Sequence, residues 1–350
     1  MRHALILAGG SGTRLWPYST AGLPKQLVPL FEGRSLLDLA VDRASAVADE
    51  VWLGAGEQLR DAVSSVEGLR ADRLILEPSG RDTLPAVALG CATILETDPD
   101  AVVAVLTADH LIEPVDAFAA SLSAGCDLAE ASDDVLVTFG VVPDFPSTGF
   151  GYLELGEPLA GAARVVSRFL EKPDLATATA FLAGGPEHYL WNSGMFVWRA
   201  ATLLAAVEAF EPETARLVRD VVDGRTGSWD VIEKKSVDVG VMEPASTSRD
   251  FRVAALPMSA RWLDVGSWPA YGDAVGRDDS GNAIAGRAVV TGSSGCVVAS
   301  NEPDHLVALV GCEGLVVVHT PEATLVMPAD QAQRVKDLHA LVQQQAPDFA

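Results

Sequence analysis

Cysteine is scarce in this sequence, with four residues among 350. They have no CxxC spacing, so neither a disulfide framework nor a zinc site is indicated. The six histidines form no HExxH motif and no His–Cys cluster, and we assign them no ligand role. Scattered thiols suit a reducing compartment, so we expect a cytoplasmic protein. The four cysteines are Cys91, Cys126, Cys296 and Cys312.

Basic residues are also few, since 25 Lys and Arg stand against 48 Asp and Glu, a formal net charge of -23. This excess argues against an extended nucleic-acid-binding surface. It also repels phosphates, so a chain of this charge that binds anions should gather its cations locally and recruit a divalent metal ion. No apolar run has the length of a transmembrane helix, and the first one breaks into glycine instead of forming a signal peptide. We therefore expect neither nucleic acid nor membrane as a partner.

The hydrophobic content of 49% is ample for a packed core. Short apolar runs alternate with helix-period segments, which predicts parallel strands with right-handed crossovers in a doubly wound α/β sheet. Ser35 is a candidate cap for one helix, and Thr83-Leu84-Pro85 opens another. The predicted strands of this first half are residues 3–8, 51–53, 73–76 and 101–106.

The second half is richer in β-strand patterns, predicted at 135–142, 151–155, 163–170 and 194–198, with a helix at 174–182. Five turn-forming residues at 278–282 interrupt the periodic pattern and suggest a domain boundary. We expect one α/β domain over residues 1–280 and a small β-rich domain over 281–350 that ends in a helix near 330–345. Ligands of doubly wound sheets lie outside the carboxyl ends of the strands.

A glycine loop, Gly9-Gly10-Ser11-Gly12-Thr13-Arg14, directly follows the first predicted strand. Its glycines let the backbone approach a ligand and present amide N–H groups to phosphate oxygens, and Arg14 adds a bidentate donor. Neither GxxxxGK[ST] nor GxGxxG is matched, because Leu15 occupies the place of the third glycine. A P-loop and a dinucleotide site are therefore disfavoured, although the loop taken alone could still be a structural turn.

The loop continues as Leu15-Trp16-Pro17 and is followed by Pro24-Lys25-Gln26. This ordered set resembles the signature of nucleoside-diphosphate-sugar pyrophosphorylases, most closely that of mannose-1-phosphate guanylyltransferases. The resemblance extends over about residues 3 to 270. It implies a Rossmann-like nucleotidyltransferase fold of the glycosyltransferase-A-like type, with GTP and mannose 1-phosphate as substrates and GDP-mannose and pyrophosphate as products.

The resemblance also implies the nucleotide-binding residues. The glycine loop would wrap the triphosphate, and Lys25 would contact phosphates in the transition state. A stretch from Glu77 to Ala86 resembles the guanine-binding region of the family, with Asp82 and Leu84 in place of the usual Asn and Ala. The implied nucleotide-binding residues are Leu7, Ala8, Gly9, Gly10, Ser11, Gly12, Thr13, Arg14, Glu77, Arg81, Asp82, Thr83 and Asp109.

Asp109 follows the apolar run at 101–106 and therefore stands at a carboxyl edge of the predicted sheet. A carboxylate there suits Mg²⁺, which prefers one or two carboxylates with waters and substrate phosphates. The alternative from the residues alone is a helix-capping aspartate. Asp264 lies in Asp264-Val265-Gly266-Ser267-Trp268, which resembles a second family motif. The resemblance implies that Asp109 and Asp264 hold Mg²⁺ together.

Three further segments match the family in order: Gly149-Phe150-Gly151-Tyr152, Glu171-Lys172-Pro173 and Asn192-Ser193-Gly194. They imply a sugar-phosphate site in which Glu171 bonds sugar hydroxyls and Lys172 pairs with the phosphate. Without the resemblance, the second segment would be read as an exposed charged turn, and Tyr152 as a core residue. The implied sugar-phosphate residues are Gly151, Tyr152, Glu171, Lys172 and Asn192.

The substrate phosphate is itself the attacking group, so in-line displacement at the α-phosphorus needs no Ser, Cys or His nucleophile. The predicted catalytic residues are Arg14, Lys25, Asp109, Lys172 and Asp264. Other nucleotide or hexose 1-phosphate specificities stay open, as do a noncatalytic nucleotide-sugar-binding protein and a homodimer. A nicotinamide dehydrogenase is a distant alternative for want of the third glycine.

Overall fold

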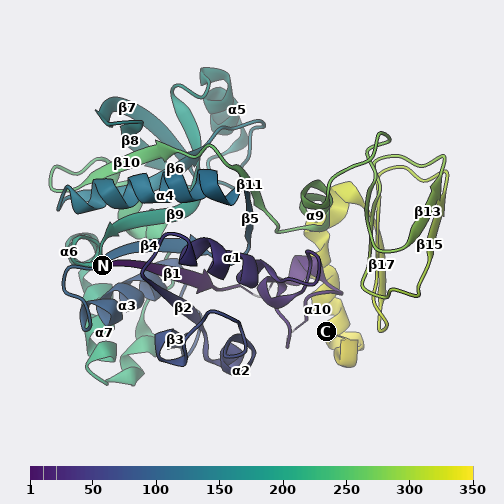
Figure 1. Ribbon diagram of the computed structural model, residues 1–350, viewed down its shortest axis with the longest axis horizontal. Helices are drawn as coiled ribbons and strands as arrows, with labels where there is room; N and C mark the ends of the chain where they lie inside the picture. The colour runs from purple at the N-terminus through teal and green to yellow at the C-terminus, as the bar shows by residue number, and fades with distance from the viewer. Residues whose placement is uncertain (11, 21, 350) are drawn as a thin grey trace. The chain divides into compact units, whose positions relative to one another are not determined.

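The structure is a computed structural model that describes residues 1–10, 12–20 and 22–349 (Figure 1). Its contacts define two compact units, each assembled from separate stretches of the chain. The expected domain boundary between residues 280 and 281 stays a prediction, because these units are not continuous in sequence. Unit 1 comprises Met1–Gly9, Ala40–Ala108 and Ile112–Trp262, and unit 2 comprises Gly10–Leu39, Asp109–Leu111 and Leu263–Ala350.

Unit 1 is built on a mixed sheet whose described strands follow the order β3-β2-β1-β4-β9-β6-β10-β8-β7. Neighbours from β3 to β4 are parallel, as are β6 and β10, whereas β9, β8 and β7 pair antiparallel. The expected doubly wound α/β sheet is thus confirmed, with antiparallel strands in its second half. The bounds are β1 (Arg2–Ala8), β2 (Glu50–Gly56), β3 (Leu74–Glu77), β4 (Val102–Thr107), β6 (Val135–Val141), β7 (Tyr152–Ala160), β8 (Ala163–Leu170), β9 (Tyr189–Arg199) and β10 (Arg252–Pro257).

Helices cover both faces of this sheet because its strands are apolar on both sides. Figure 1 shows α4 lying across the central strands. A Cβ atom added to Gly125 of α4 would lie 3.4 Å from Val197 of β9, whereas Phe196 and Trp198 belong to the apolar cluster on the other face with α3, α6 and α7. The helices of unit 1 are α2 (Arg60–Val63), α3 (Thr83–Leu95), α4 (Val115–Glu130), α5 (Leu175–Gly184), α6 (Ala200–Phe210), α7 (Pro212–Val222) and α8 (Glu243–Ser246).

Three elements contain residues of both units. They are α1 (Leu36–Ser45), β5 (His110–Glu113) and β11 (Arg261–Asp264), and the two strands pair with each other. The expected cap of α1 is confirmed: Ser35 Oγ accepts a hydrogen bond from the Asp38 amide at 3.1 Å, and Asp38 Oδ2 accepts one from the Ser35 amide at 2.8 Å. This reciprocal pair satisfies two amides at the helix start.

The C-terminal part of unit 2 forms stacked coils of short strands. β12, β14 and β16 are parallel neighbours with Ala283, Val297 and Val316 in register, and β13 pairs in parallel with β15. The expected β-rich appendage and its closing helix are confirmed, but the coil repeat was not apparent in the sequence. The bounds are α9 (Trp268–Val275), β12 (Ala283–Ala285), β13 (Ala288–Thr291), β14 (Val297–Ser300), β15 (Val307–Val310), β16 (Leu315–His319), β17 (Thr324–Pro328) and α10 (Val335–Gln345).

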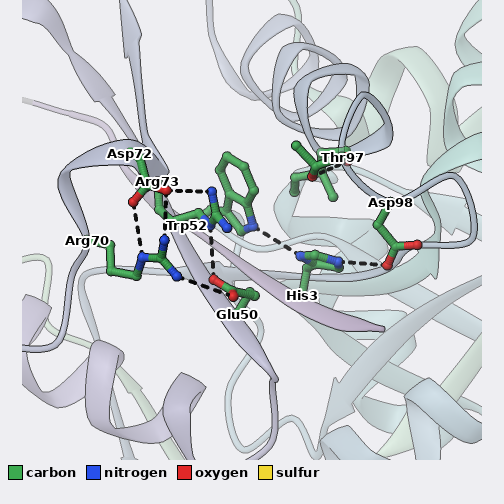
Figure 2. A network of polar contacts seen from close by, with 9 residues as sticks. His3, Glu50, Trp52, Arg70, Asp72, Arg73, Thr97 and Asp98 are labelled. Atoms are coloured by element: carbon green, nitrogen blue, oxygen red, sulfur yellow. Dashed lines mark hydrogen bonds and ion pairs between the residues drawn. The ribbon is translucent and has the colours of Figure 1, made fainter.

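A polar network closes the end of the sheet opposite the glycine loop, at the first residues of β1 and β2 (Figure 2). Trp52 Nε1 donates to His3 Nδ1 at 3.1 Å, so His3 Nε2 carries the proton that is shared with Asp98 Oδ2 at 3.0 Å. The Arg73 guanidinium lies 4.6 Å from the Trp52 ring centroid and pairs with Glu50. Every polar atom of the buried His3 ring therefore has a partner, which identifies this network as structural.

Across the described residues, we find no helix with the length and apolar character needed to cross a membrane.

Candidate active site

The glycine loop begins where β1 ends and leads into a short 3-10 turn, η1 (Thr13–Leu15). Gly12 has a φ of 59°, and a Cβ atom at this position would lie 2.5 Å from Lys25 Cβ. Ser19 Oγ donates to the Gly12 carbonyl at 2.7 Å and fixes this part of the loop. Glycine is needed here both for the left-handed backbone and for the close approach of Lys25. Ser11, a predicted phosphate contact, lies outside the described residues.

The Lys25 ammonium lies between two carboxylates within unit 2. Its Nζ atom is 2.6 Å from Asp109 Oδ2 and 3.8 Å from Asp264 Oδ1. Lys25 is buried in η2 (Lys25–Leu27), and both aspartates are partly exposed. Three residues that are far apart in the sequence therefore meet at one point next to the glycine loop.

The charges around Asp109 set its protonation state. Burial alone would raise the pKa of Asp109, but the positive charges of Lys25 and His110 outweigh burial and hold that pKa below its ordinary value. Asp109 is thus an anion at neutral pH. Because each carboxylate can accept a cation, the pair has the donor set of a Mg²⁺ site. Within the described residues, no group of three or more acids, histidines or cysteines has the arrangement to hold a metal ion.

Arg14 and the Asp264 segment belong to the same part of unit 2. A Cβ atom on Gly266 would lie 3.6 Å from Arg14 Nη2 and 3.1 Å from Asp264 Oδ1. Trp268 Nε1 donates to the Trp16 carbonyl at 3.0 Å, which joins the Asp264 segment to the chain that follows the glycine loop. The four predicted charged residues Arg14, Lys25, Asp109 and Asp264 thus form one cluster.

A second cluster lies in unit 1, at the start of β7. The backbone amide of Asn192 donates to the Gly151 carbonyl at 2.8 Å. A Cβ atom on Gly151 would lie 2.6 Å from Glu171 Oε2. Gly151 therefore leaves room for the Glu171 carboxylate over the backbone. The structure brings these three predicted sugar-site residues together.

Lys172 pairs with Glu171 and has a φ of 47°. Burial lowers its pKa, but the hydrogen bond to Glu171 and the charges of Glu171, Asp238 and Asp82 outweigh burial and raise it. Asp82 also has a positive φ, 69°. Such backbone conformations are strained for residues with side chains and cluster at functional sites.

Tyr152 has a different environment from its neighbour Gly151. Successive residues of a strand point to opposite faces of the sheet. Tyr152 is 1% exposed, and its ring centroid lies 5.3 Å from that of Phe181 in α5. Tyr152 therefore has the apolar surroundings of a core residue, in a cluster with Phe181 and Trp191, and its contact with a sugar stays a prediction.

Asp238 is the residue of this cluster that the sequence analysis missed. Asn192 Nδ2 donates to Asp238 Oδ1 at 2.8 Å, while Asn192 Oδ1 accepts from Thr138 Oγ1 at 2.7 Å. Both polar atoms of the Asn192 side chain therefore have a hydrogen-bond partner. Burial raises the pKa of Asp238 to about 7, and the negative charge of Glu171 adds to the increase. No short motif marked Asp238, because its partners come from distant strands.

The predicted guanine-binding stretch is bonded to the segment that carries Asp238. The Leu84 amide donates to the Lys235 carbonyl at 3.0 Å, and Thr83 Oγ1 accepts from the Val237 amide at 2.9 Å. Leu84 is fully buried, and a Cβ atom on Gly240 would lie 2.7 Å from its Cδ2. Leu84, which is larger than the alanine usual in the family, thus fits inside the core because position 240 is glycine.

The other residues of the predicted nucleotide site stand at strand ends or in loops. Leu7 and Ala8 end β1, and the Leu7 carbonyl accepts from the Ala108 amide at 3.2 Å. Burial raises the pKa of Glu77, the last residue of β3, to about 7. Arg81 Nη2 lies 3.6 Å from Asp230. Their contacts with a nucleotide stay predictions.

Two known protein families match most of this chain. The sequence profile of nucleotidyl transferases matches residues 3–280. This chain belongs to the nucleotidyl transferase family. A second profile, described as a MannoseP isomerase/GMP-like beta-helix domain, matches residues 286–341 of this nucleotidyl transferase. The match agrees with the stacked coils observed there.

Named relatives of this nucleotidyl transferase cover nearly the whole chain. A mannose-1-phosphate guanylyltransferase of Klebsiella pneumoniae is 36% identical over 95% of this chain and 72% of its own length. One of Escherichia coli strain K12 has the same identity and coverage. A crystal structure described as mannose-1-phosphate geranyltransferase from Thermus thermophilus has a TM-score of 0.88 and 33% identity, with 98% of this chain and 99% of that chain covered.

Replacing Gly12 by alanine should displace Lys25 from the two aspartates, because the new Cβ atom would lie 2.5 Å from Lys25 Cβ. We expect turnover of this nucleotidyl transferase to fall by about 100-fold or more, as when a charge-stabilising group is lost. Gly22→Ala is the matched control, since a Cβ atom there meets nothing within 4 Å. Equal turnover of the two variants would contradict the assigned role of Gly12.

Asp238→Asn should stabilise the nucleotidyl transferase fold more as the pH rises. The folded pKa of Asp238 is about 7, above the ordinary aspartate value of about 3.9. Its contribution to stability is therefore complete below pH about 4 and is lost as the pH rises through 7. We expect the melting-temperature difference between variant and wild type to be larger at pH 8 than at pH 5. A difference that does not change with pH, or equal pH profiles for Asp238→Asn and for the same substitution at the exposed Asp250, would contradict this.

Proposed function

We propose that this chain joins mannose 1-phosphate to GTP, forming GDP-mannose and pyrophosphate. The observation that carries the proposal is the convergence of Asp109 and Asp264 on the Lys25 ammonium beside the glycine loop. The ammonium of such a cluster can stabilise negative charge on phosphates, and its carboxylates can bind a cation. Nucleotidyl transfer needs both. The names of the full-length relatives support guanine and mannose as the specific partners.

The reaction needs no protein nucleophile in this proposal. A phosphate oxygen of mannose 1-phosphate attacks the α-phosphorus of GTP, a new P–O bond forms, and the bond to the β-phosphate oxygen breaks so that pyrophosphate leaves. Arg14 and Lys25 offset the negative charge that develops on the phosphates. The protein contributes position and charge.

Mg²⁺ fits the two carboxylates of unit 2. Asp109 and Asp264 both lie close to the positive charge of Lys25, and Mg²⁺ prefers one or two carboxylates together with water and phosphate oxygens. The ion would polarise phosphate oxygens and neutralise their charge. Asp109 and Asp264 would hold the ion, and the Lys25 ammonium, which pairs with both carboxylates, would then be available to a phosphate.

The cluster of unit 1 supports recognition of a sugar phosphate. Glu171 and Asn192 offer an acceptor and an amide to hydroxyl groups, and Lys172 offers a charge to phosphate. An unpaired buried polar group costs about 1–3 kcal/mol, which is enough to discriminate the hydroxyl arrangement of mannose from that of glucose. The proposal also includes a cytoplasmic location, which the free thiols of all four cysteines favour.

The proposal is tested by pyrophosphate release from GTP, ATP, UTP and dTTP, each with mannose or glucose 1-phosphate, with and without Mg²⁺. We expect the largest kcat/KM for GTP with mannose 1-phosphate and loss of turnover without the metal ion. Preference for another pair would change the assigned specificity. Tight GTP binding without any turnover would instead favour a noncatalytic nucleotide-sugar-binding protein.

Asp109→Asn and Asp264→Asn should each lower kcat by about 100- to 1000-fold, because each removes charge from the proposed metal site. Asp279→Asn, in an exposed turn of the same unit, makes the same change of charge and should keep wild-type turnover. Full activity in both site variants would refute the metal assignment.

A further inference from the structure

The C-terminal segment of unit 2 packs against the chain that follows the glycine loop. Ala332 and Val335 are buried in one apolar cluster with Leu15 and Trp16. Trp16 Nε1 also donates to the Phe349 carbonyl at 2.8 Å. The turn η7 (Ala329–Arg334) and helix α10 therefore pack against η1 and Trp16, and the hydrogen bond joins Trp16 to the turn η8 (Pro347–Phe349).

Gln333 stands between the two buried anchors of this segment, Ala332 and Val335, with its own side chain at the surface. Its Oε1 atom accepts a hydrogen bond from Arg14 Nη1 at 3.1 Å. The other terminal nitrogen of Arg14, Nη2, is the atom near Gly266. The guanidinium of Arg14 thus has a neighbour on each side, one from the Asp264 motif and one from the C-terminal segment.

The chemistry of Gln333 suits an orienting role. A long arginine side chain loses conformational entropy when it is fixed, so a partner that fixes it in advance makes anion binding stronger. An amide oxygen can do this without cancelling the positive charge, whereas a carboxylate would form an ion pair that competes with phosphate.

We propose that Gln333 is a positioning residue that orients Arg14 for the triphosphate of the nucleotide. The C-terminal β-rich segment thereby supplies part of the phosphate-binding arrangement. This inference rests on the proposed function only through the assignment of Arg14 to the triphosphate.

Gln333→Glu is the decisive variant, because it keeps the shape and the acceptor but adds a negative charge next to Arg14. We expect KM for GTP, and the Kd for GTP measured by calorimetry, to rise about fivefold or more, while KM for mannose 1-phosphate stays unchanged. Gln333→Ala should show a smaller rise, about twofold, since it removes the orienting bond without adding charge.

Gln331→Glu is the matched control. Gln331 lies in the same turn, but its side chain contacts Asp330 and Arg334 instead of Arg14. The same charge at this position should leave KM for GTP within about twofold of the wild-type value, since Arg334, and not Arg14, is the cation that contacts this side chain.

A double-mutant cycle separates positioning from a general structural effect. In the Arg14→Ala background, Gln333→Glu should cause no further rise in the Kd for GTP. An equal rise with and without Arg14, or equal effects of Gln333→Glu and Gln331→Glu, would overturn the inference. Absence of turnover in the wild-type protein would contradict the proposed function, while the calorimetric comparison would still decide the role of Gln333.

Discussion

The ammonium of Lys25 between the carboxylates of Asp109 and Asp264 is the interaction on which the other features of the site depend. Two carboxylates placed close together repel one another, and a cation between them removes that repulsion. The left-handed Gly12 gives Lys25 the space to reach this position. In a chain with a net charge of -23, this local balance of charge is what permits anionic substrates to bind. The metal ion of the proposed reaction would take over the role that Lys25 plays in the structure.

In the proposed function, the two units have different chemical roles. Unit 2 contains the charged residues suited to phosphates, Arg14, Lys25, Asp109 and Asp264, together with the C-terminal coils. Unit 1 contains the polar residues suited to a sugar, and its Asn192 amide is fixed by Thr138 and Asp238. The C-terminal segment shares an apolar core with the residues that follow the glycine loop, so changes in that core should reach the phosphate-binding residues.

Much of the fold was predictable from local patterns. Continuous apolar runs such as residues 101–106 identify buried parallel strands, and Ser35 marks a helix start through its capping chemistry. The pairing of Asp109 with Asp264 came from resemblance, because no periodicity relates residues so distant. Asp238 and Gln333 were missed for the same reason: their roles follow from contacts across the fold. The stacked coils were missed because their strands have only three to five residues and their repeat length varies.

In the proposed reaction, Asp109 and Asp264 would bind one divalent cation in place of the Lys25 ammonium. The most direct measurement is a crystal structure with GTP and Mn²⁺, in which anomalous scattering locates the ion. We expect one strong peak within coordination distance of both carboxylates and of phosphate oxygens, with the Lys25 ammonium in contact with the nucleotide. A peak away from either carboxylate, or Lys25 still bound between the two aspartates in the nucleotide complex, would contradict it.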